Sequence, residues 1–599
     1  MIYLSDNPEP KEIIEVAQRA VNDDSMYRSN VVDNYNYYFG DQWPEGDKQA
    51  LDRARRPHLT INRTKQIVDL VINTQASGRT TVRVLPVGSE DVGITDTLQD
   101  LLFHLNEHQA IRWKKMQVYA DGLIGGRGYM MVGVSYENNM YGDIEVYPLD
   151  PPSVIFDPTA IQPCLKDAGF VVRQSYMSPE QMRTVYGVNI KDVYPSPKDT
   201  LISSFMYYPD RLMDSYNKYH VVECWYKVWE YVPVVVNTET GDVTEAKNEQ
   251  QAMEMARAFA EAGKPILTPG KYRMAKTRVK TICGGTVLGE GYSPFGGDMY
   301  PIAPYFASHI ANVHYGLVQG IRDPQDELNK RRSEGLHHAT ATAHSAWLIE
   351  DGSVNEREFK RDASQPGAFL KYKRSTGRPP QQITAGQIAP DYLAAIQMAD
   401  QDIRMASGVN ADLLGIAGDS ESSGKAIALR QAQSTKAIGM YGDNFRFFER
   451  DLALKEIRAI QKIYTQPRML RVLGEGGVEG GAQFKTVAIN IRDQATGKII
   501  NDLSIGKYDV AIGNQPDTET QRQTDFYEMV DMLMKLSKLP FPFILALIKE
   551  SPLHNKDKII ETFSKLMAQM SSQRPAQGQM GPQSAPGRLP TTRASQRTA

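Results

Sequence analysis

The sequence predicts an α+β fold, and three observations support this prediction. Residues 8–76 carry apolar side chains at the 3–4-residue spacing of helices. From residue 80 to about 310 the pattern changes to short apolar or alternating runs between turn residues, as expected of β-strands. From residue 323 to about 464 helical spacing returns in long segments. Such segregation of helices and strands is typical of an α+β chain.

Composition sets the broad class of the protein. The chain has 599 residues, and a prior of roughly 150 residues per domain suggests three to four units. A hydrophobic content of 41% and a charged content of 23% are ordinary for a soluble globular protein. A formal charge of −3 argues against a protein that grips nucleic acid over its whole surface, but it allows one that surrounds DNA without holding it.

Cysteine usage and the chain's apolar runs indicate the compartment. The cysteines form no CxxC pair, so each is expected to be a small buried hydrophobe in a reducing environment: Cys164, Cys224 and Cys283. Residues 1–13 lack the basic and apolar regions of a secretory signal. The longest apolar run, 541–548, is far shorter than the ~20 residues that cross a bilayer. We therefore expect a protein that works in a cytoplasm without membrane contact.

The N-terminal segment is expected to be mostly helical. In the stretch 62–74 one helical stripe is apolar, and Gly78 closes it; its members are Ile67, Val68, Val71 and Ile72. The aromatic cluster FGDQW at 39–43, which Pro44 interrupts, predicts a helix end that is pinned into a core.

The middle of the chain is expected to be rich in strand. Five segments between residues 80 and 310 have strand patterns: TVRVLPV, YMMVGVSY, GDIEVYPLD, FVVRQSYM and VVECWYKVWEYVPVVV. A helical insert is expected at about 91–123, between the first two strands. The polar, Glu-rich piece at 245–263 predicts a helix on the surface.

A helix start is predicted at Asp323 and Pro324. Aspartate suits the N-cap, proline suits the first helical position, and the acids that follow favour the positive end of the helix dipole. The helix is expected to run to about Ala343 and carries few apolar residues. So polar a helix predicts a position in solvent or against copies of itself, rather than in the core of its own chain.

Two further helices are expected after a compact mixed segment at 345–389. The first, 390–407, has one apolar stripe, comprising Tyr392, Ile396, Ala399, Ile403 and Ala406. Gly408 ends it, and a loop of small and acidic residues follows at 409–424. The second runs from 425 to about 464, a length of about 60 Å. Its stripe has heptad-like spacing and consists of Ile438, Tyr441, Phe445, Phe448, Leu452, Ala459 and Ile463.

The C-terminal part is predicted to hold strands and then helices. Strands are expected around 486–491 and 508–512, and helices at about 518–536 and 543–570. Residues 571–599 are rich in Gln, Pro, Ser and Gly, with no acidic residue, and predict a disordered tail.

No motif in the sequence predicts catalysis, a cofactor or a metal site. The stretch GDSESSGKA at 418–426 has the look of a phosphate loop, but its spacing is one residue too long and Ala426 stands where Ser or Thr would hold magnesium. The Gly-rich piece 125–128 precedes a strand, so it is interpreted as a turn. Three histidines have no cysteine or suitably spaced carboxylate nearby and are interpreted as polar residues along a helix or channel: His337, His338 and His344.

One basic run stands beside the predicted helix start. It consists of Lys330, Arg331 and Arg332. In a monomer such a run is a solvated helix face. In a ring the same residues form a belt of positive charge.

Three stretches resemble the portal proteins of short-tailed, double-stranded-DNA bacteriophages. The first is YNYYFGDQW together with RPHLTINRTKQIVDLVINTQASGR at 56–79. The second is GIRDPQDELNKRRSEGLHHATA at 320–341, which is the most specific because Asp-Pro-Gln-Asp-x-x-Asn-Lys-x-x-Ser is not a generic helix start. The third is the order of elements across 323–464. The similarity covers roughly residues 25–540.

The resemblance implies a portal-type fold with the following parts: a mixed α/β wing at 1–319, stem helices at 320–344 and 390–408, a clip at 345–389, a channel loop at 409–424, a long wing-to-channel helix at 425–466, strands returning to the wing at 467–517, a short helical crown at 518–570 and a disordered tail at 571–599. From the sequence we expect no counterpart here of the long C-terminal barrel of some members, because the predicted helices end near residue 570.

The resemblance also implies a structural role without catalysis. About twelve subunits would form a ring at one capsid vertex, within the virion and, during assembly, in the host cytoplasm. A terminase motor would drive double-stranded DNA through the ring, and tail adaptor proteins would dock on it later. Major capsid and scaffolding proteins are further expected partners.

Three sets of residues are the expected functional surfaces of such a ring. The DNA-channel loop and its flanks comprise Asp412, Asp419, Glu421, Lys425 and Arg430. The basic belt of the stem comprises Lys330, Arg331 and Arg332. The docking surface of the clip comprises Lys371, Lys373 and Arg374.

Two other classes of protein compete with this interpretation. An ATP-driven nucleic-acid motor needs a true Walker motif, which the sequence lacks. A tail adaptor or minor capsid protein keeps the assembly but loses the DNA channel. A ring with a central hole wide enough for duplex DNA would distinguish the portal from both.

Overall fold

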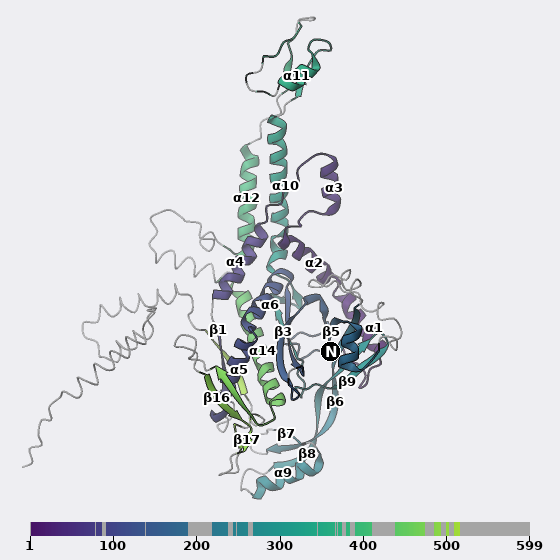
Figure 1. Cartoon of the computed structure of the whole chain (residues 1–599), viewed down its shortest axis with the longest axis vertical. Helices are drawn as coiled ribbons and strands as arrows, with labels where there is room; N and C mark the ends of the chain where they lie inside the picture. Colours follow the sequence, from purple (N-terminus) through teal and green to yellow (C-terminus); the bar gives the residue numbers. More distant parts are fainter. Residues whose placement is uncertain are drawn as a thin grey trace, which may run out of the picture. The chain divides into compact units, whose positions relative to one another are not determined.

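The computed structural model in Figure 1 describes most of residues 2–514. Besides single positions, it leaves out 78–79, 87–91, 190–217, 238–242, 262–266, 344–345, 374–378, 384–389, 410–435, 474–483, 493–498, 504–507 and 515–599. The helices expected at 518–536 and 543–570, the tail expected at 571–599, and Gly78 therefore lie outside the described residues.

Four helices form the N-terminal part, as the sequence predicts. They are α1 (Pro10–Asp23), α2 (Ser25–Phe39), α3 (Glu45–Arg53) and α4 (Arg63–Ser77). The predicted stripe of α4 is buried at Ile67, Val68 and Val71. Trp43 is also buried, and its indole N–H donates to the Leu59 carbonyl at 3.1 Å. Phe39, however, is 74% exposed, so of the two aromatic residues in this cluster only Trp43 anchors the helix end in the core.

The next elements build a small antiparallel sheet backed by helices. They are β1 (Thr80–Pro86), α5 (Val92–His108), α6 (Ile111–Gly125), β2 (Arg127–Ser135) and β3 (Asp143–Leu149). The sheet has the order β10-β2-β3, with β10 (Ile302–Phe306) supplied from later in the chain. The predicted turn at 125–128 is confined to Gly126, because Gly125 still belongs to α6 and Arg127 already begins β2; Gly126 adopts a φ of 95°.

A larger antiparallel sheet has the order β4-β5-β6-β8-β9, and β7 pairs with the far end of β6. Its strands are β4 (Val154–Phe156), β5 (Phe170–Met177), β6 (Tyr219–Asn237), β7 (Val243–Glu245), β8 (Leu267–Cys283) and β9 (Thr286–Tyr292). The segments predicted as β5 and β6 are confirmed. The sequence patterns did not predict β8, because five basic residues and Pro269-Gly270 hide its alternation; it nevertheless pairs with β6 along its whole length.

The remaining elements are short or belong to the regions discussed below. They are η1 (Pro151–Ser153), α7 (Pro179–Tyr186), α9 (Glu249–Glu261), β11 (His309–Ile310), β12 (Val313–His314), α10 (Leu317–Ala343), β13 (Ala346–Leu348), α11 (Glu356–Asp362), β14 (Gln381–Ile383), α12 (Pro390–Ser407), α14 (Gly439–Ile463), β15 (Arg468–Leu473), β16 (Phe484–Ile489), β17 (Ile491–Arg492), β18 (Ile499–Ile500) and β19 (Tyr508–Asn514). The surface helix expected in the Glu-rich piece is α9, and the strands expected near 486 and 508 are β16 and β19.

Helix α14 lies at the centre of the main hydrophobic core. The predicted stripe is confirmed, since Phe445, Phe448 and Leu452 are fully buried. The Phe445 ring meets the rings of Tyr119 and Tyr305 with centroid distances of 4.8 and 5.3 Å. Edge-to-face contacts of this kind add to the gain from burying apolar area. The part of the expected helix at 425–435 lies outside the described residues.

The first and last strands of the described chain close the main core together. Strand β1 pairs antiparallel with β19, and Val84 and Val510 are buried opposite each other in this pair. Two of the cysteines, Cys224 and Cys283, are buried as expected, whereas Cys164 is only half-buried. Helices accompany several sheets whose described strand pairs are antiparallel, which agrees with the predicted α+β class.

Candidate functional site

Helix α10 begins at Leu317, seven residues before the predicted first residue, Pro324. Its first turns place Leu317, Val318 and Ile321 in the main core, so the helix starts inside the body of the chain. Pro324 is therefore an interior residue rather than the first one. A proline there has no N–H to donate to the carbonyl four residues earlier. That carbonyl belongs to Gly320, which is exposed. The prediction of a helix start at Asp323 was wrong because the apolar turn before it was not counted.

A polar face of α10 is buried by the chain's own N-terminal segment. The side chains of Gln325, Asn329 and Ser333 are all buried and lie at i, i+4 and i+8 on one face. Each accepts a hydrogen bond from a backbone N–H of the segment 59–64: Arg63 to Gln325 at 3.0 Å, Ile61 to Asn329 at 2.9 Å and Leu59 to Ser333 at 2.8 Å. We call these three residues the polar ladder. The expectation that a helix this polar has no core position in its own chain was wrong.

The spacing of the polar ladder matches that of an extended chain. Four residues of helix rise about 6 Å, and two residues of extended chain span about 6.6 Å. Alternate N–H groups of the segment 59–64 can therefore meet successive rungs of the helix. The Gln325 amide also donates to the Ile61 carbonyl at 2.8 Å, so the ladder satisfies both kinds of backbone group.

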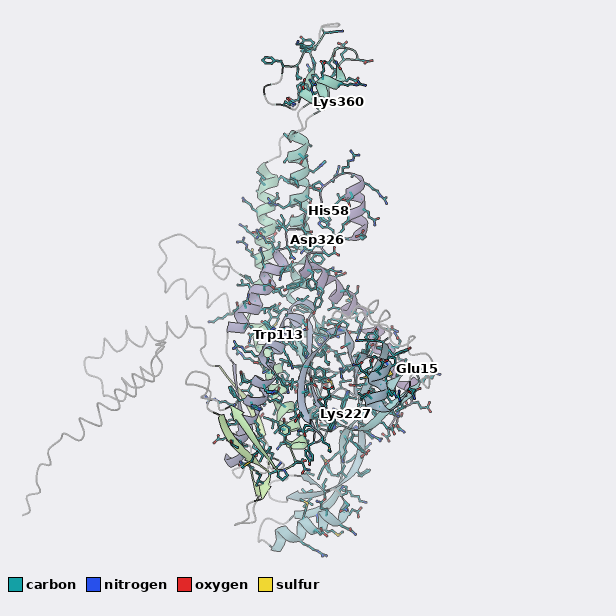
Figure 2. The ribbon with its side chains drawn as sticks, in the orientation of Figure 1. Glu15, His58, Trp113, Lys227, Asp326 and Lys360 are labelled. Atoms are coloured by element: carbon teal, nitrogen blue, oxygen red, sulfur yellow. The ribbon has the colours of Figure 1, made fainter. Side chains whose placement is uncertain are left out.

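A second set of contacts ties the polar ladder to α2. The Asn329 amide donates to Gln42 at 2.6 Å, and the Gln42 amide donates to the Tyr37 carbonyl at 2.8 Å. The Tyr37 hydroxyl donates to Asp326 at 2.6 Å, and Asp326 is labelled on α10 in Figure 2. Two of the stretches quoted above for their resemblance thus lie in contact. Their polar residues form one hydrogen-bond network.

Helix α12 runs beside α10, as Figure 1 shows. Its observed bounds agree with the predicted helix, and Gly408 ends it with a φ of 70°. The Tyr392 hydroxyl donates to the Arg331 carbonyl at 2.7 Å and joins the two helices. Asp400 pairs with Arg63 of α4 at 2.9 Å and with Arg404 at 2.6 Å. Ala399 and Ile403 of the predicted stripe are buried, while Ala406 is exposed.

The three basic residues predicted on the stem helix have different surroundings. Arg331 pairs with Glu327 at 2.6 Å and is half-buried, so it offers little free charge. Lys330 and Arg332 are exposed, and the described residues offer neither an ion-pair partner. Further along the same helix His337 is half-buried and His338 exposed, while His344 lies outside the described residues.

A small unit joins the far ends of α10 and α12 (Figure 1). In it β13 pairs with β14, and the Trp347 ring meets the buried Phe359 edge-on at 5.2 Å. This agrees with the compact mixed segment expected there. Lys371 and Lys373 are exposed, as a docking surface requires. Arg374 lies outside the described residues.

Except for Val409, which is buried, the predicted channel loop, 409–424, lies outside the described residues. This holds for all five of its expected functional residues, Asp412, Asp419, Glu421, Lys425 and Arg430. It holds also for the stretch 418–426 that has the look of a phosphate loop. Their expected roles remain predictions.

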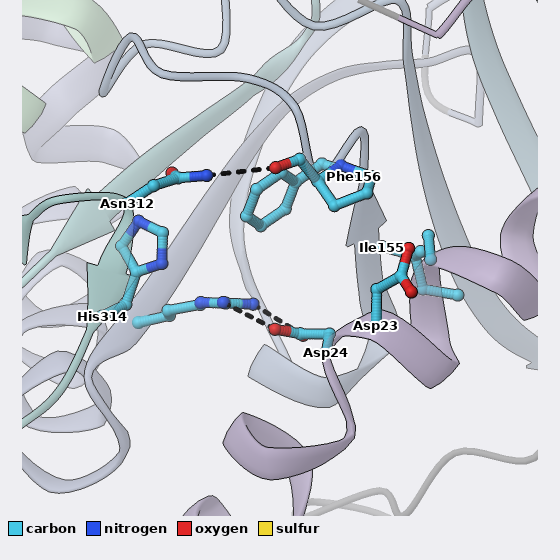
Figure 3. Close-up of a pocket in the computed structure, with 9 residues that line it drawn as sticks. Asp23, Asp24, Ile155, Phe156, Asn312 and His314 are labelled. Carbon is cyan, nitrogen blue, oxygen red and sulfur yellow. Dashed lines mark hydrogen bonds and ion pairs between the residues drawn. The ribbon is translucent and has the colours of Figure 1, made fainter.

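A cavity of about 140 Å³ lies where α1 meets β4 and β12, and none of its lining residues is a predicted site residue (Figure 3). Asp24 and Arg127 form a two-pronged ion pair on its wall, with N–O distances of 2.8 and 2.7 Å. Burial lowers the pKa of His314 to about 2, with Arg127 and then His309 adding to the effect. The Nε2 atom of the neutral His314 ring forms a hydrogen bond with Nδ1 of His309 at 2.9 Å. The arrangement holds the α1–α2 junction against β2.

The residues that the structure describes contain no group of three or more His, Cys, Asp or Glu residues placed to hold a metal ion. Among the helices described, none is both long and apolar enough to span a membrane.

The helix pair α10 and α12 is thus anchored at one end by an apolar turn, a hydrogen-bond ladder and ion pairs. These contacts fix the position of an exposed pair of helices against the body of the chain. A family model described as "Phage P22-like portal protein" matches residues 15–597. The chain belongs to this family of phage portal proteins, and the resemblance drawn from its motifs is confirmed.

Two further comparisons accompany the family match. The portal protein of Helicobacter pylori bacteriophage KHP30 is 23% identical over 516 residues, which cover 86% of this chain and 74% of that protein. A solved chain from the virion of a native gene transfer agent particle aligns with 79% of this chain and 86% of its own length, with 11% identity and a TM-score of 0.34. That structural likeness is too weak to support an argument. Portal proteins are structural virion components that form oligomeric rings.

The sequence patterns did not predict the polar ladder or its partner segment. A usable signal was present, because Gln325, Asn329 and Ser333 recur every four residues on one face. Polar residues at helical spacing predict either a solvated face or a buried hydrogen-bonded one. Only the path of residues 59–64 decides between these two.

Proposed function

We propose that this chain is the subunit of a ring at one capsid vertex, through which viral DNA enters during packaging and leaves during ejection. About twelve copies, the number that the resemblance suggests, would surround the channel. The ring would also serve as the docking platform for the terminase motor and later for tail adaptor proteins. Major capsid and scaffolding proteins would contact it from the shell.

The asymmetry of α10 is the observation that supports this proposal most. Up to Ser333 the helix repeatedly buries side chains in its own chain, whereas no side chain described after that residue is buried. Helix α12 covers only one side of this outer half. A two-helix projection with exposed flanks is what neighbouring copies in a closed ring would cover. The anchored half would keep each projection at a fixed angle to its own body.

The loop after α12 is proposed to line the channel. It follows directly on the helix pair in sequence, and its carboxylates Asp412, Asp419 and Glu421 would repeat in every copy. Like charge would keep the duplex centred, while Lys425 and Arg430 would supply weaker attraction. A variant with Asp419→Lys and Glu421→Lys should package slowly in low salt and recover as salt screens the added attraction. Wild-type packaging at every salt concentration would contradict this placement.

The unit between α10 and α12 is proposed as the clip, which docks the motor and then the tail. Lys371 and Lys373 are exposed on it, and Arg374 adjoins them in sequence. Replacing these three by Gln should leave rings intact and weaken motor docking, because exposed charges mainly steer association. Unchanged packaging by such a variant would remove the clip assignment.

Electron microscopy of the purified full chain tests the proposal as a whole. The expected result is a closed ring with a central hole wide enough for duplex DNA. An assembly without a hole would favour a tail adaptor or minor capsid protein. Adding ATP separates the motor alternative, because the ring by itself should not hydrolyse it.

A further inference from the structure

A short arm, residues 44–58, is closed at its base and projects from the body of the chain. At this base Trp43 donates to the Leu59 carbonyl, and the rings of Trp43 and His58 meet edge-on at 6.5 Å. His58 lies between α3 and α10 in Figure 2. The polar ladder binds the segment 59–64, which directly follows the arm. The direction of the arm relative to α10 is therefore defined.

Helix α3 of this arm has no buried residue. Ordering the backbone of a residue costs about 1–2 kcal/mol, which helices in proteins usually recover by burying one face. Local ion pairs exist, such as Lys48 with Asp41 and Glu45, but they lie on the surface and stabilise little. The apolar residues of α3 and its end, Ala50 and Ala54, are exposed, and Leu51 is half-buried. The helix therefore presents an uncovered face.

The C-terminal end of α3 has an arginine, Arg55, in a strained backbone conformation. The N–H groups of Arg55 and Arg56 donate to the carbonyls of Asp52 and Leu51 at 3.0 and 2.9 Å, which is the paired pattern of a Schellman cap. In this cap Arg55 takes the left-handed conformation, with a φ of 52°, that glycine adopts most easily. Arg53, Arg55 and Arg56 are all exposed, and no described residue pairs with them. An arginine at a position that glycine would occupy with less backbone strain indicates that its charge has a function.

Helix α12 has an outer stripe of matching character on the side away from α10. Its members are exposed and lie at i, i+4, i+7, i+8 and i+11: Ala394, Met398, Gln401, Asp402 and Met405. Met398 is 61% and Met405 80% exposed. Asp402 stands between them and has no ion-pair partner among the described residues. The stripe thus combines an apolar surface with one free carboxylate.

We propose that the arm of one copy docks on the outer stripe of α12 in the adjacent copy. Leu51, Ala50 and Ala54 would cover the two methionines, and the arginines at the end of α3 would pair with Asp402. This inference rests on the proposed ring, which places a second copy beside each helix pair. The arm then acts as a clasp between neighbours, and the polar ladder sets its direction.

The composition of both surfaces favours a second copy over nucleic acid. A phosphate backbone would satisfy the three arginines, but it would leave the apolar side chains of α3 and α12 uncovered. It would also be repelled by the exposed Glu45 and Asp47 on the same helix. The stripe on α12 offers both an apolar surface for the side chains of α3 and a carboxylate for its arginines.

Charge exchange tests the proposed contact in the full chain. Asp402→Arg and Arg55→Asp should each raise the protein concentration at which half the chains are in rings by about tenfold, since each places like charges together or removes the pair. The double variant should return to within about threefold of wild type, because the pair is restored in reverse. Arg19→Asp, an exposed arginine on α1, is the matched control and should have no effect. Mass photometry over a dilution series gives these values.

Arg55→Gly separates docking from folding. Glycine relieves the left-handed strain, so the variant should melt at the wild-type temperature or above it while its rings weaken. A purely local structural role for Arg55 predicts no loss of rings.

Cross-linking locates the contact. With Cys164→Ser to remove the half-buried native thiol, Ala50→Cys together with Met398→Cys should give dimers and higher multimers on mild copper–phenanthroline oxidation. Ala50→Cys with Leu393→Cys is the control, because Leu393 is exposed but lies off the stripe. Rings that form without this cross-link, together with charge variants that assemble like wild type, would overturn the arm contact and leave the proposed function standing. If wild-type protein forms no ring, both fail.

Discussion

Helices α14 and α10 are the two longest among the described residues, with 25 and 27 residues, and they are held by different forces. The buried stripe of α14 is mainly aromatic and aliphatic and packs against rings from α6 and β10. The buried middle of α10 consists of Gln325, Asn329 and Ser333, which hydrogen-bond a neighbouring backbone. Both helices use the same spacing of about one residue per turn, so the geometry alone does not distinguish them.

The difference teaches how each helix is positioned. Apolar packing is non-directional, so α14 is stabilised by the area it buries and by the close fit of its rings. Hydrogen bonds require particular distances and angles, so the ladder of α10 allows one register against the segment 59–64. In the proposed ring the aromatic helix would supply stability, and the ladder would set the direction of the projecting helix pair and arm.

The largest effect should follow from emptying the aromatic core. Phe445→Ala removes a fully buried ring and should lower the free energy of unfolding by about 3–5 kcal/mol. Phe447→Ala is the matched control on the same helix, since Phe447 is 42% exposed and should cost far less. Urea denaturation of both variants measures the difference. Equal losses would show that burial on α14 does not decide its stability.

A buried acid on α14 predicts a pH effect. Burial raises the pKa of Glu456 to about 7; the Lys115 charge and an Asn106 hydrogen bond oppose the rise, and Glu449 adds to it. Between pH about 4.5 and 7 the folded chain keeps this proton while the unfolded chain loses it, so stability falls as the pH rises through that window. Glu456→Gln should remove this fall and gain roughly 3 kcal/mol over wild type at pH 8.

At pH 4 the same variant should match wild type, because both states then hold the proton. Glu15→Gln, at an exposed carboxylate of α1, is the control and should follow the wild-type pH profile. Thermal melts from pH 4 to 8 provide the comparison. A parallel profile for Glu456→Gln would mean that this carboxyl ionises normally in the folded chain.

Breaking the ladder should have a smaller but more local effect. Asn329→Ala leaves the Ile61 N–H and the side-chain oxygen of Gln42 without this partner, which should cost about 2 kcal/mol. Amide hydrogen exchange should accelerate at residues 59–64 while α14 stays protected. Lys330→Ala, its exposed neighbour, is the control. Unchanged exchange at 59–64 would show that the ladder does not hold this segment.

The smallest effect is expected between α10 and α12. Burial and then Glu334 raise the pKa of Tyr392 to about 12, so its hydroxyl stays a donor at neutral pH. Tyr392→Phe removes the bond to the Arg331 carbonyl and should cost about 1 kcal/mol. Tyr372→Phe is the control, because Tyr372 is exposed in the unit that joins the two helices. It should leave the free energy of unfolding unchanged. Urea denaturation measures both, and a loss as large as that from Asn329→Ala would rank this contact beside the ladder.

Several elements could be predicted because their signals are local. The bounds of α12 follow from its 3–4 spacing and the glycine that ends it, and β5 and β6 follow from dense β-branched and aromatic runs. The start of α10 was missed because the strong Asp323-Pro324 signal outweighed an apolar turn before it. Strand β8 was missed because its five basic residues and Pro269-Gly270 hide the alternation of apolar side chains.

The functional surfaces could be predicted only in part. Lys330, Arg332, Lys371 and Lys373 are exposed, as expected of surface charges. Arg331 has an internal partner in Glu327, one turn away, which a sequence count of charges does not take into account. The arm and the outer stripe of α12 were not predicted, because neither has a motif. They are recognised from exposed side chains that none of the described residues covers.

The sequence by itself determined the class of the fold, most of the helices and strands, and the family. Periodicity, caps and motifs are properties of neighbouring residues, so they can be recognised without knowing what packs against them. Only the tertiary structure decided that the polar face of α10 is buried, that β1 pairs with β19, and that none of the described residues buries a side chain of α3. Each of these depends on partners far away in the chain, and spacing shows which side chains share a face but not what covers it.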